Sequence, residues 1–234
     1  MDWDTLELIE LVVTLSVVPL AILAAYLDRR HRAKSASAWR EVADHCDLHF
    51  LDRGAADQEL EESYRGYKLR VSSELFKVEA GRSTQTCYVT TIAVNTLQAA
   101  VREARIDPRE PYAHETGEWK ATTKSFAAAF RQNDAEVTRW LADDPDLRHV
   151  MERVQAAGDN LELREGQVRR SRQHLFASFG ELLKFINTTI ELTSKIDARA
   201  RQLIRAEDAP GEGKVVNSEM EEAVGAGASG GELW

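Results

Sequence analysis

The start of the chain combines an acidic lead, a long uncharged run and a basic end, and this pattern limits what the segment can form. Residues 11–27 contain no charged side chain. The flanking charges are Asp2, Asp4, Glu7 and Glu10 before the run and Arg29, Arg30, Arg32 and Lys34 after it. Charge is costly in hydrocarbon, so an uncharged run of this length is typical of a helix that spans a bilayer. The sequence predicts a single transmembrane helix over residues 11–27.

Three alternative structures fit this run less well. A buried helix of a soluble fold could have the same composition. An amphipathic surface helix would need a charged face, which residues 11–27 lack. A cleaved signal peptide carries its basic residues before the apolar run, whereas here they follow it.

The basic residues also predict an orientation, because Lys and Arg favour the cytoplasmic side of a membrane. Residues 1–10 would be a short extracytoplasmic N-terminus, and the rest of the chain would face the cytoplasm from the inner membrane. Residues 28–35 would be a basic juxtamembrane linker. The residues expected to flank the anchor there are Arg29, Arg30, Arg32 and Lys34.

The composition of the chain after the predicted anchor limits its possible functions and divides it into a domain and a tail. The formal charge of −9 argues against general affinity for nucleic acid. Two cysteines, Cys46 and Cys87, are no disulfide framework and agree with a reducing compartment. Residues 206–234 carry seven acidic residues against Lys214 alone among Gly, Ala and Ser, which predicts a disordered acidic tail that is a solubiliser or an interaction segment. Residues 36–205 remain for one domain.

That domain alternates between helical and strand periodicities, which predicts an α+β fold. A helix over residues 37–46 leads into a short strand, and Gly66 marks the turn of a hairpin. Residues 75–79 and 86–94 continue an antiparallel sheet. Pro145 begins a later helix, and Gly166 marks a second hairpin. The predicted fold class is therefore a transmembrane helix followed by an antiparallel sheet with packed helices and a long C-terminal helix.

The long helix is expected over about residues 173–205 and has an apolar stripe. Its early turns would cover the sheet, and the turns after Ile190 would project into solvent. Core packing is the simpler role for the stripe. The alternative is a helix for self-association, as a coiled coil or homo-oligomer, or for docking of a partner, through the small side chains Thr188, Thr189, Thr193 and Ser194.

Candidates for catalysis or metal binding are sparse. His45, Cys46 and His49 could form a corner of a zinc site but supply no fourth ligand. His114 and Glu115 in a loop could do acid–base work if a pocket forms there. His149 lies near other ionisable groups of a helix, namely Asp146 and Glu152. No resident metal or cofactor is expected, and the catalytic residues stay unknown.

Four arginines around the second hairpin form a possible partner contact. They are Arg164, Arg169, Arg170 and Arg172. Alternate residues of a strand share a face, so the third and fourth would point one way and Arg169 the other. No aromatic side chain lies within the hairpin to stack a base, which argues against nucleic acid. A solvated hairpin is the simpler interpretation, and lipid headgroups, an acidic partner or the chain's own tail are the alternatives.

The order of landmarks over most of residues 39–200 resembles a known family. The landmarks are Trp39, Ala43, Leu48, the Tyr64-Arg65-Gly66-Tyr67 turn, Thr116-Gly117-Glu118, Phe126, Phe130, Leu147-Arg148, and Leu161-Glu162-Leu163 with Gly166. They look like bacterial membrane-anchored proteins of unknown function related to the galanin-like domain-of-unknown-function family. Those relatives read Thr-Gly-Asp and then Phe-Asp, where this chain has Glu118 and Phe126-Ala127. The resemblance implies architecture and membrane association, and it implies no site residues.

Together these features predict a membrane-tethered, non-enzymatic cytoplasmic module that binds a protein or lipid partner. The alternative is a membrane-bound hydrolase or metal enzyme that uses His114, Glu115 or the corner at His45 and His49. Side chains that converge in one concave pocket would favour the enzyme. The expected partners are membrane lipid, an unknown protein and a second copy of the chain through the long helix.

Overall fold

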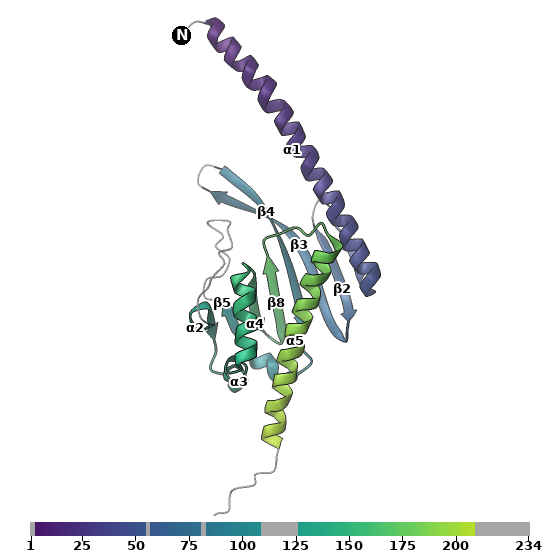
Figure 1. Cartoon of the computed structure of the whole chain (residues 1–234), viewed down its shortest axis with the longest axis vertical. Coiled ribbons are helices and arrows are strands. Elements are labelled where there is room, and N and C mark those ends of the chain that lie inside the picture. Colours follow the sequence, from purple (N-terminus) through teal and green to yellow (C-terminus); the bar gives the residue numbers. More distant parts are fainter. Residues whose placement is uncertain (1–2, 55–56, 81–82, 109–125, 209–234) are drawn as a thin grey trace, which may run out of the picture.

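The body of the protein is built on one antiparallel sheet of eight strands, in the spatial order β1-β2-β3-β4-β8-β7-β5-β6 (Figure 1). The computed structural model describes residues 3–54, 57–80, 83–108 and 126–208. The strands are β1 (His49–Asp52), β2 (Gln58–Tyr64), β3 (Tyr67–Ala80), β4 (Ser83–Asn95), β5 (Ile106–Pro108), β6 (Phe130–Gln132), β7 (Asn160–Arg164) and β8 (Gln167–Arg172). The helices are α1 (Trp3–Cys46), the 3-10 helix η1 (Ala99–Glu103), α2 (Phe126–Ala129), α3 (Glu136–Ala142), α4 (Pro145–Ala156) and α5 (Phe179–Asp208).

Both predicted hairpins are confirmed, and their turns explain their registers. The β2–β3 turn has φ of 52° at Arg65 and 80° at Gly66, and the β7–β8 turn has 55° at Glu165 and 75° at Gly166. Positive φ at both central residues defines the two-residue turn whose twist matches that of paired strands. Tyr64 therefore pairs with Tyr67, and the second turn aligns β7 with β8 in the same way.

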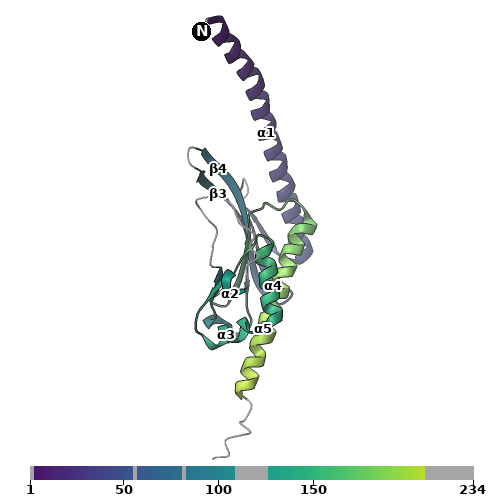
Figure 2. The ribbon, with the colours of Figure 1, turned by 60° about the vertical axis from the view of Figure 1, so that its left-hand side comes forward.

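Helices α1, α4 and α5 cover one face of the sheet (Figure 2). Side chains alternate between faces along each strand, and the helix-covered face takes the apolar ones. One row across this face shows the pattern and a single exception, a buried arginine. The row, in register, is Leu60, Val71, Ile92, Arg170 and Leu161.

Helix α5 connects two hydrophobic clusters that lie under this one sheet. Its first half, with Phe185 and Ile186, packs with the end of α1 and with β2 to β4. Its second half, with Leu192, Ile196 and Leu203, packs with α3, α4 and the other strands. The prediction that the turns after Ile190 project into solvent is wrong, because these side chains fill the second cluster.

Helix α1 is continuous over 44 residues, and no break separates residues 11–27, 28–35 and 37–46. Its final turns are buried against the sheet and α5 through Trp39, Val42 and Ala43. The earlier turns extend away from the body (Figures 1 and 2). We refer to residues 3–34, which precede the buried Ser35, as the α1 arm.

The structure overturns the predicted single-pass membrane anchor. Within the part of the chain that the structure describes, no helix has both the length and the apolar character needed to cross a bilayer. The uncharged run of this helix, residues 11–27, is about 26 Å long, whereas the hydrocarbon core is about 30 Å thick. Charges then follow from Asp28 onward. The transmembrane part of the predicted fold class and the inner-membrane localisation are therefore wrong, and only the α+β architecture stands.

The basic residues predicted to flank the anchor lie on this same continuous helix. Arg32 forms an ion pair with Asp28, one turn earlier in α1. Arg29, Arg30 and Lys34 are exposed on the arm. The predicted acidic tail lies outside the described residues from position 209 onward.

Candidate functional site

Two arginines and an aspartate form a buried charged cluster on the helix-covered face. Arg170 and Arg172 are alternate residues of β8, so both point to this face. Asp159 directly precedes β7, and the pairing of Asn160 with Ser171 brings it beside Arg172. The side chain of Asp159 is 0% exposed and that of Arg170 is 8% exposed. Such buried charges require partners.

Asp159 accepts hydrogen bonds from both arginines. Arg170 Nε lies 2.6 Å from Oδ2, and Arg172 Nη2 lies 2.8 Å from the same oxygen. Arg170 Nη1 also donates to Thr188 Oγ1 of α5, at 2.6 Å. Two guanidinium groups and one carboxylate leave one net positive charge. The cluster ties β8 to the α4–β7 turn and to α5.

Aromatic rings of α5 and of the segment before it complete the cluster. The Phe185 ring lies 4.6 Å from the Arg170 guanidinium and 5.5 Å from that of Arg172, measured to the ring centroid. Phe176 lies 5.9 Å from the Arg172 guanidinium. Burial lowers the pKa of Arg170, and Asp159 opposes this shift. An arginine nevertheless keeps its charge at neutral pH.

A cavity of about 670 Å³ lies over the cluster and has a mixed charged rim. Lys184, His174 and Glu181 line it together with both arginines. Burial lowers the pKa of His174, Glu181 opposes the shift, and Arg172 adds to it. Since a carboxylate and a neutral imidazole share this rim, the cavity is only weakly cationic. The cluster below it fits a structural clamp better than a site for a reaction.

The four arginines of the second hairpin do not form one patch. Arg169 points to the opposite face of the sheet and pairs with Glu162 at 3.2 Å. Arg164, beside the turn, pairs with Glu165 at 3.2 Å. Their side chains are 51% and 55% exposed, in contrast to Arg170. The pleat therefore divides these side chains between the two faces of the sheet, and a partner contact through them stays a prediction.

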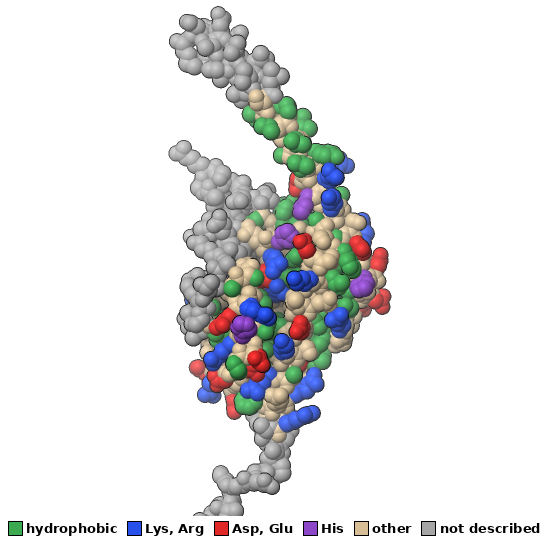
Figure 3. Space-filling view, in the orientation of Figure 1, with side chains coloured by type: hydrophobic (Ala, Val, Ile, Leu, Met, Phe, Trp, Pro, Cys, Tyr) green, Lys and Arg blue, Asp and Glu red, His purple; other side chains and the backbone are tan. Residues whose placement is uncertain are grey.

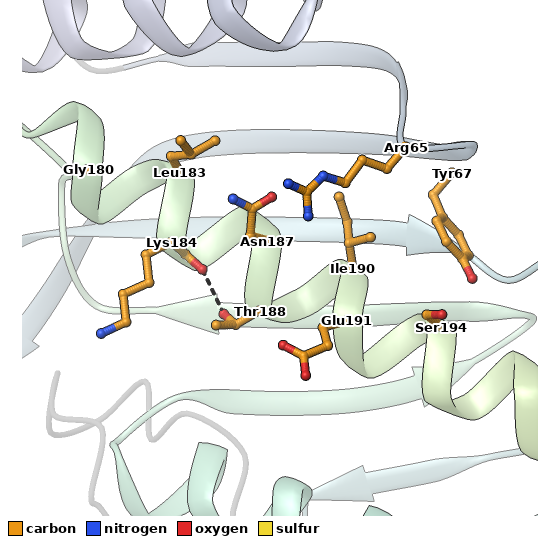
Figure 4. A pocket seen from close by; sticks show the side chains of 10 residues that line it. All are labelled: Arg65, Tyr67, Gly180, Leu183, Lys184, Asn187, Thr188, Ile190, Glu191 and Ser194. Atoms are coloured by element: carbon orange, nitrogen blue, oxygen red, sulfur yellow. Dashed lines mark hydrogen bonds between the residues drawn. The ribbon is translucent and has the colours of Figure 1, made fainter.

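A groove of about 640 Å³ runs along the outer face of α5 (Figure 4). Arg65 extends over it from the β2–β3 turn toward Asn187 and Ile190. Thr188 donates a hydrogen bond to the backbone carbonyl of Lys184, 2.9 Å away. The lining thus mixes two basic groups, the carboxylate of Glu191, an amide, hydroxyls and apolar surface, with no arrangement of nucleophile and base among the residues drawn.

The small-residue surface predicted on α5 is divided. Thr189 and Thr193 are buried and donate to carbonyls of their own helix, those of Phe185 and Thr189, at 2.8 and 2.9 Å. Thr188 and Ser194 are exposed and line the groove. The contact of two copies through α5 stays a prediction, with half of its residues in the core.

The three side chains predicted to form part of a zinc site do not converge on one point. The His45 ring packs edge-on against Phe179, with centroids 5.4 Å apart. Cys46 is buried, and burial raises the pKa of its thiol, which disfavours the thiolate that binds metal. His49 is exposed on the edge strand β1. The described residues contain no group of three or more His, Cys, Asp or Glu side chains placed to hold a metal ion.

The other residues predicted for acid–base chemistry either lie apart from one another or fall outside the described residues. His149 is exposed on α4, facing a groove that Asp146 also lines. The Glu152 carboxylate instead accepts a hydrogen bond from the Phe126 amide at 2.5 Å. His114 and Glu115 lie outside the described residues.

The α1 arm presents the largest group of exposed apolar side chains among the described residues. Figure 3 shows these side chains along the arm and a group of basic side chains where the arm meets the body. Exposure reaches 64% at Leu20 and 65% at Ile22. The full set is Val17, Val18, Leu20, Ile22, Leu23, Tyr26 and Leu27. Residues 16–27 of the arm therefore expose apolar side chains on every side and are not packed on the body of the protein.

Specific contacts fix the base of the arm. The Ser35 hydroxyl lies 3.0 Å from Gln58 Oε1 and 2.8 Å from the Phe176 carbonyl oxygen, and Ser35 is fully buried. Tyr88 of β4 donates a hydrogen bond to Asp28 at 3.1 Å. These contacts hold the helix in a direction that carries the apolar segment away from the sheet.

Sequence reasoning missed Asp159, although a pattern that indicates it is present. A two-residue turn at Glu165-Gly166 pairs residue 164 with 167 and therefore sets residue 159 opposite 172. An acidic residue at that position faces the side chain of Arg172. The base of the arm, at Ser35 and Tyr88, has no comparable local pattern, because its contacts join residues far apart in the chain.

Comparison with known proteins gives no relative for this chain. No protein-family model, no curated protein and no solved structure matches it. The resemblance to the galanin-like family therefore stays a prediction.

Proposed function

We propose that the protein is a binding module that docks on another protein through its α1 arm. The observation that carries the proposal is the group of seven large apolar side chains on the arm, which are about half exposed or more. Exposed apolar surface that is contiguous marks an interaction site more often than a chance feature. The arm is held away from the sheet by its base, so this surface is available to a partner.

The free energy gained by burying these apolar side chains supports docking. Full burial of a large aliphatic side chain is worth about 1.5 to 3 kcal/mol, so covering the exposed half of one contributes about 1 kcal/mol. Seven such side chains supply several kcal/mol, from which the entropy cost of association must be subtracted. Exposure of this apolar surface to water costs free energy, and binding of a partner that covers the surface removes most of that cost.

The rest of the body fits the role of a scaffold for the arm. Charged groups in its interior, such as Asp159 and Arg170, are satisfied by one another. Among the residues that the structure describes, no three or more His, Cys, Asp or Glu side chains are grouped so that they could hold a metal ion. No observation on the described residues favours a hydrolase or a metal enzyme.

Site-specific photo-crosslinking in cells tests the proposal. A photoreactive phenylalanine analogue replaces Leu23 on the arm of the full chain, and the matched control carries it at Lys68, an exposed residue on the other side of the sheet. We expect discrete protein adducts from position 23 and none of the same mass from position 68. Absence of any protein adduct from the arm, or identical adducts from both positions, would contradict the proposal.

A further inference from the structure

We infer that the cavity over the buried cluster of Arg170, Arg172 and Asp159 binds a small organic molecule that carries a phosphate group. The inference does not depend on the docking role of the α1 arm, because the cavity lies between β8, the α4–β7 turn and the first half of α5. Its volume of about 670 Å³ is within the range of sites that hold small organic ligands. Basic side chains lie over the region of α4 and α5 on this side of the molecule (Figure 3).

The guanidinium group of Arg172 has one edge engaged and one edge available. Nε lies 2.5 Å from Oδ1 of Asp159, and Nη2 lies 2.8 Å from Oδ2, so the carboxylate covers the edge that these two nitrogens form. Nη1 has no hydrogen-bond partner among the residues that the structure describes. The second edge, formed by Nη1 and Nη2, can donate to two oxygens of one oxyanion. Since Arg172 lines the cavity and its side chain is 34% exposed, a ligand can reach this edge.

The cations at the floor of the cavity are ordered before a ligand binds. Asp159 fixes both guanidinium groups, and Arg170 is also held by Thr188, whose hydroxyl lies 2.6 Å from Nη1. The ring of Phe185 lies against both arginines. Donors that are already held in place lose little conformational entropy when they bind an anion. The single carboxylate of Asp159 does not neutralise two guanidinium groups, so positive charge remains for a ligand.

Lys184 of α5 supplies a third cation to the cavity. Its side chain is exposed and forms no ion pair within the described part of the chain. Figure 4 shows this side chain extending away from Arg65. A phosphate group has three strong acceptor oxygens, so two can bind the free edge of Arg172 and one remains for an ammonium group. A carboxylate has two oxygens, both of which that edge would use, so phosphate is the better match.

The remaining lining has room for the organic part of the ligand. One phosphate ion would fill only a small part of about 670 Å³. Phe176 and Ala157 also line the cavity and offer apolar contact. A phosphate ester with a compact apolar group should therefore bind more tightly than inorganic phosphate.

Glu181 on the rim opposes an anion and gives the inference an internal check. Its side chain is 64% exposed, and its carboxylate lies 4.0 Å from Nε2 of His174. With Glu181 included, the three cations exceed the two carboxylates by one charge. Removal of the Glu181 carboxylate should therefore strengthen phosphate binding, whereas removal of the Lys184 ammonium should weaken it.

Isothermal titration calorimetry of the full chain with phenyl phosphate tests the inference. Inorganic phosphate and benzoate serve as comparison ligands, and constant ionic strength keeps screening the same. We expect phenyl phosphate to bind about tenfold more tightly than benzoate and more tightly than inorganic phosphate. Absence of phosphate binding, or equal affinity for benzoate, would overturn the inference.

Charge variants test whether the predicted side chains hold the phosphate. Lys184→Gln should weaken binding of phenyl phosphate about fivefold, and Glu181→Gln should strengthen it about twofold. The matched control is Lys68→Gln, which removes an exposed lysine from the other face of the sheet and should change nothing. Arg172→Gln should abolish binding. Because it also removes a partner of Asp159, Lys184→Gln decides the matter if the Arg172 variant unfolds. Equal affinities of the Lys184 variant and the native chain would contradict the inference.

Amide chemical shifts locate the ligand. On addition of phenyl phosphate, the amide signals of Gly158 and Lys184 should move, and that of Val101, in η1, should not. Shifts confined to Ile22 and Leu23 would show that the phenyl group binds the exposed apolar arm, and they would overturn the assignment to the cavity.

Discussion

Arg172 and Asp159 face each other across the β7–β8 hairpin with two hydrogen bonds, from Nε to Oδ1 at 2.5 Å and from Nη2 to Oδ2 at 2.8 Å. The same carboxylate also accepts from Arg170, whose side chain is buried in an otherwise apolar row. One aspartate therefore accepts hydrogen bonds from two arginines. This dependence makes Asp159 the charged residue whose loss the body should tolerate least.

We expect Asp159→Asn to lower the free energy of unfolding by about 3 to 5 kcal/mol, because it leaves the buried Arg170 guanidinium without a counter-charge. Urea unfolding followed by tryptophan fluorescence measures the change. The control is Glu165→Gln, which removes the acid of an exposed pair with Arg164 and should change stability little. Equal stability of the two variants would show that Arg170 does not depend on Asp159.

A double variant separates charge balance from packing. Replacement of a buried ion pair by apolar groups of similar volume is often neutral or stabilising, whereas removal of one partner is costly. Asp159→Asn with Arg170→Met should therefore be more stable than Asp159→Asn alone. A double variant as unstable as the single one would mean that the loss arises from packing around Asp159 and not from the unpaired charge.

The two turn glycines of the second half provide a matched pair for backbone strain. Gly158 and Gly166 have φ of 80° and 75°. A Cβ at Gly158 would meet nothing within 4 Å, whereas one at Gly166 would lie 3.0 Å from Cγ of Arg102. Gly158→Ala should cost about 1 to 2 kcal/mol from its left-handed backbone alone. Gly166→Ala should cost more, and thermal unfolding of the two proteins side by side tests this order.

Local patterns in the sequence are sufficient to predict the hairpins and the start of α4. Gly66 and Gly166 indicate the turns, and the Asp144 carboxylate accepts from the amides of Asp146 and Leu147 at the predicted helix start. The face shared by Arg170 and Arg172 also follows from the strand period. These features depend on neighbours within a few residues, which is why one sequence reveals them.

Features that depend on distant contacts have no such local signal. The uncharged run predicts a membrane helix, because nothing local shows that it continues unbroken into a helix fixed to the body at Ser35. The apolar stripe of the long helix weakens after Ile190, which predicts that Asp197 lies on a solvent-exposed end of this helix. In the structure Asp197 is fully buried. Its partner residues, Leu97 and Gln98, lie about one hundred positions away in sequence.

His174 should make stability depend on pH near neutrality. Burial lowers its pKa below the ordinary value of 6.5 in the folded chain. As pH falls through 6.5 the unfolded chain binds a proton that the folded chain does not yet bind, so the free energy of unfolding decreases. The side chain is 45% exposed, so solvent reduces the effect to about a few tenths of a kcal/mol.

Comparison of two histidine variants isolates this contribution. Between pH 7.5 and 5.5, the His174→Asn protein should lose less stability than the native chain, as measured by urea unfolding at each pH. His149→Asn, at an exposed position of α4, should follow the native curve. A His174→Asn curve parallel to the native one would show that this imidazole does not contribute.

Asp197 joins the end of α5 to the segment that starts η1, and its removal should loosen that segment. Oδ1 accepts from the Leu97 amide at 3.0 Å and from the Gln98 amide at 3.2 Å. Gln98 precedes η1 and has no side-chain cap of its own. Asp197→Ala leaves these two amides unpaired beside a buried helix, and we expect a loss of about 2 kcal/mol or more.

Amide hydrogen exchange shows whether this loss is local. In the Asp197→Ala protein, exchange at Leu97 and Gln98 should accelerate more than exchange at Val168 and Leu163, which are paired within the sheet. Asp197→Asn keeps one acceptor oxygen and should retain most of the protection. If the Ala variant instead accelerates all four amides equally, Asp197 stabilises the body as a whole and is not a cap for η1.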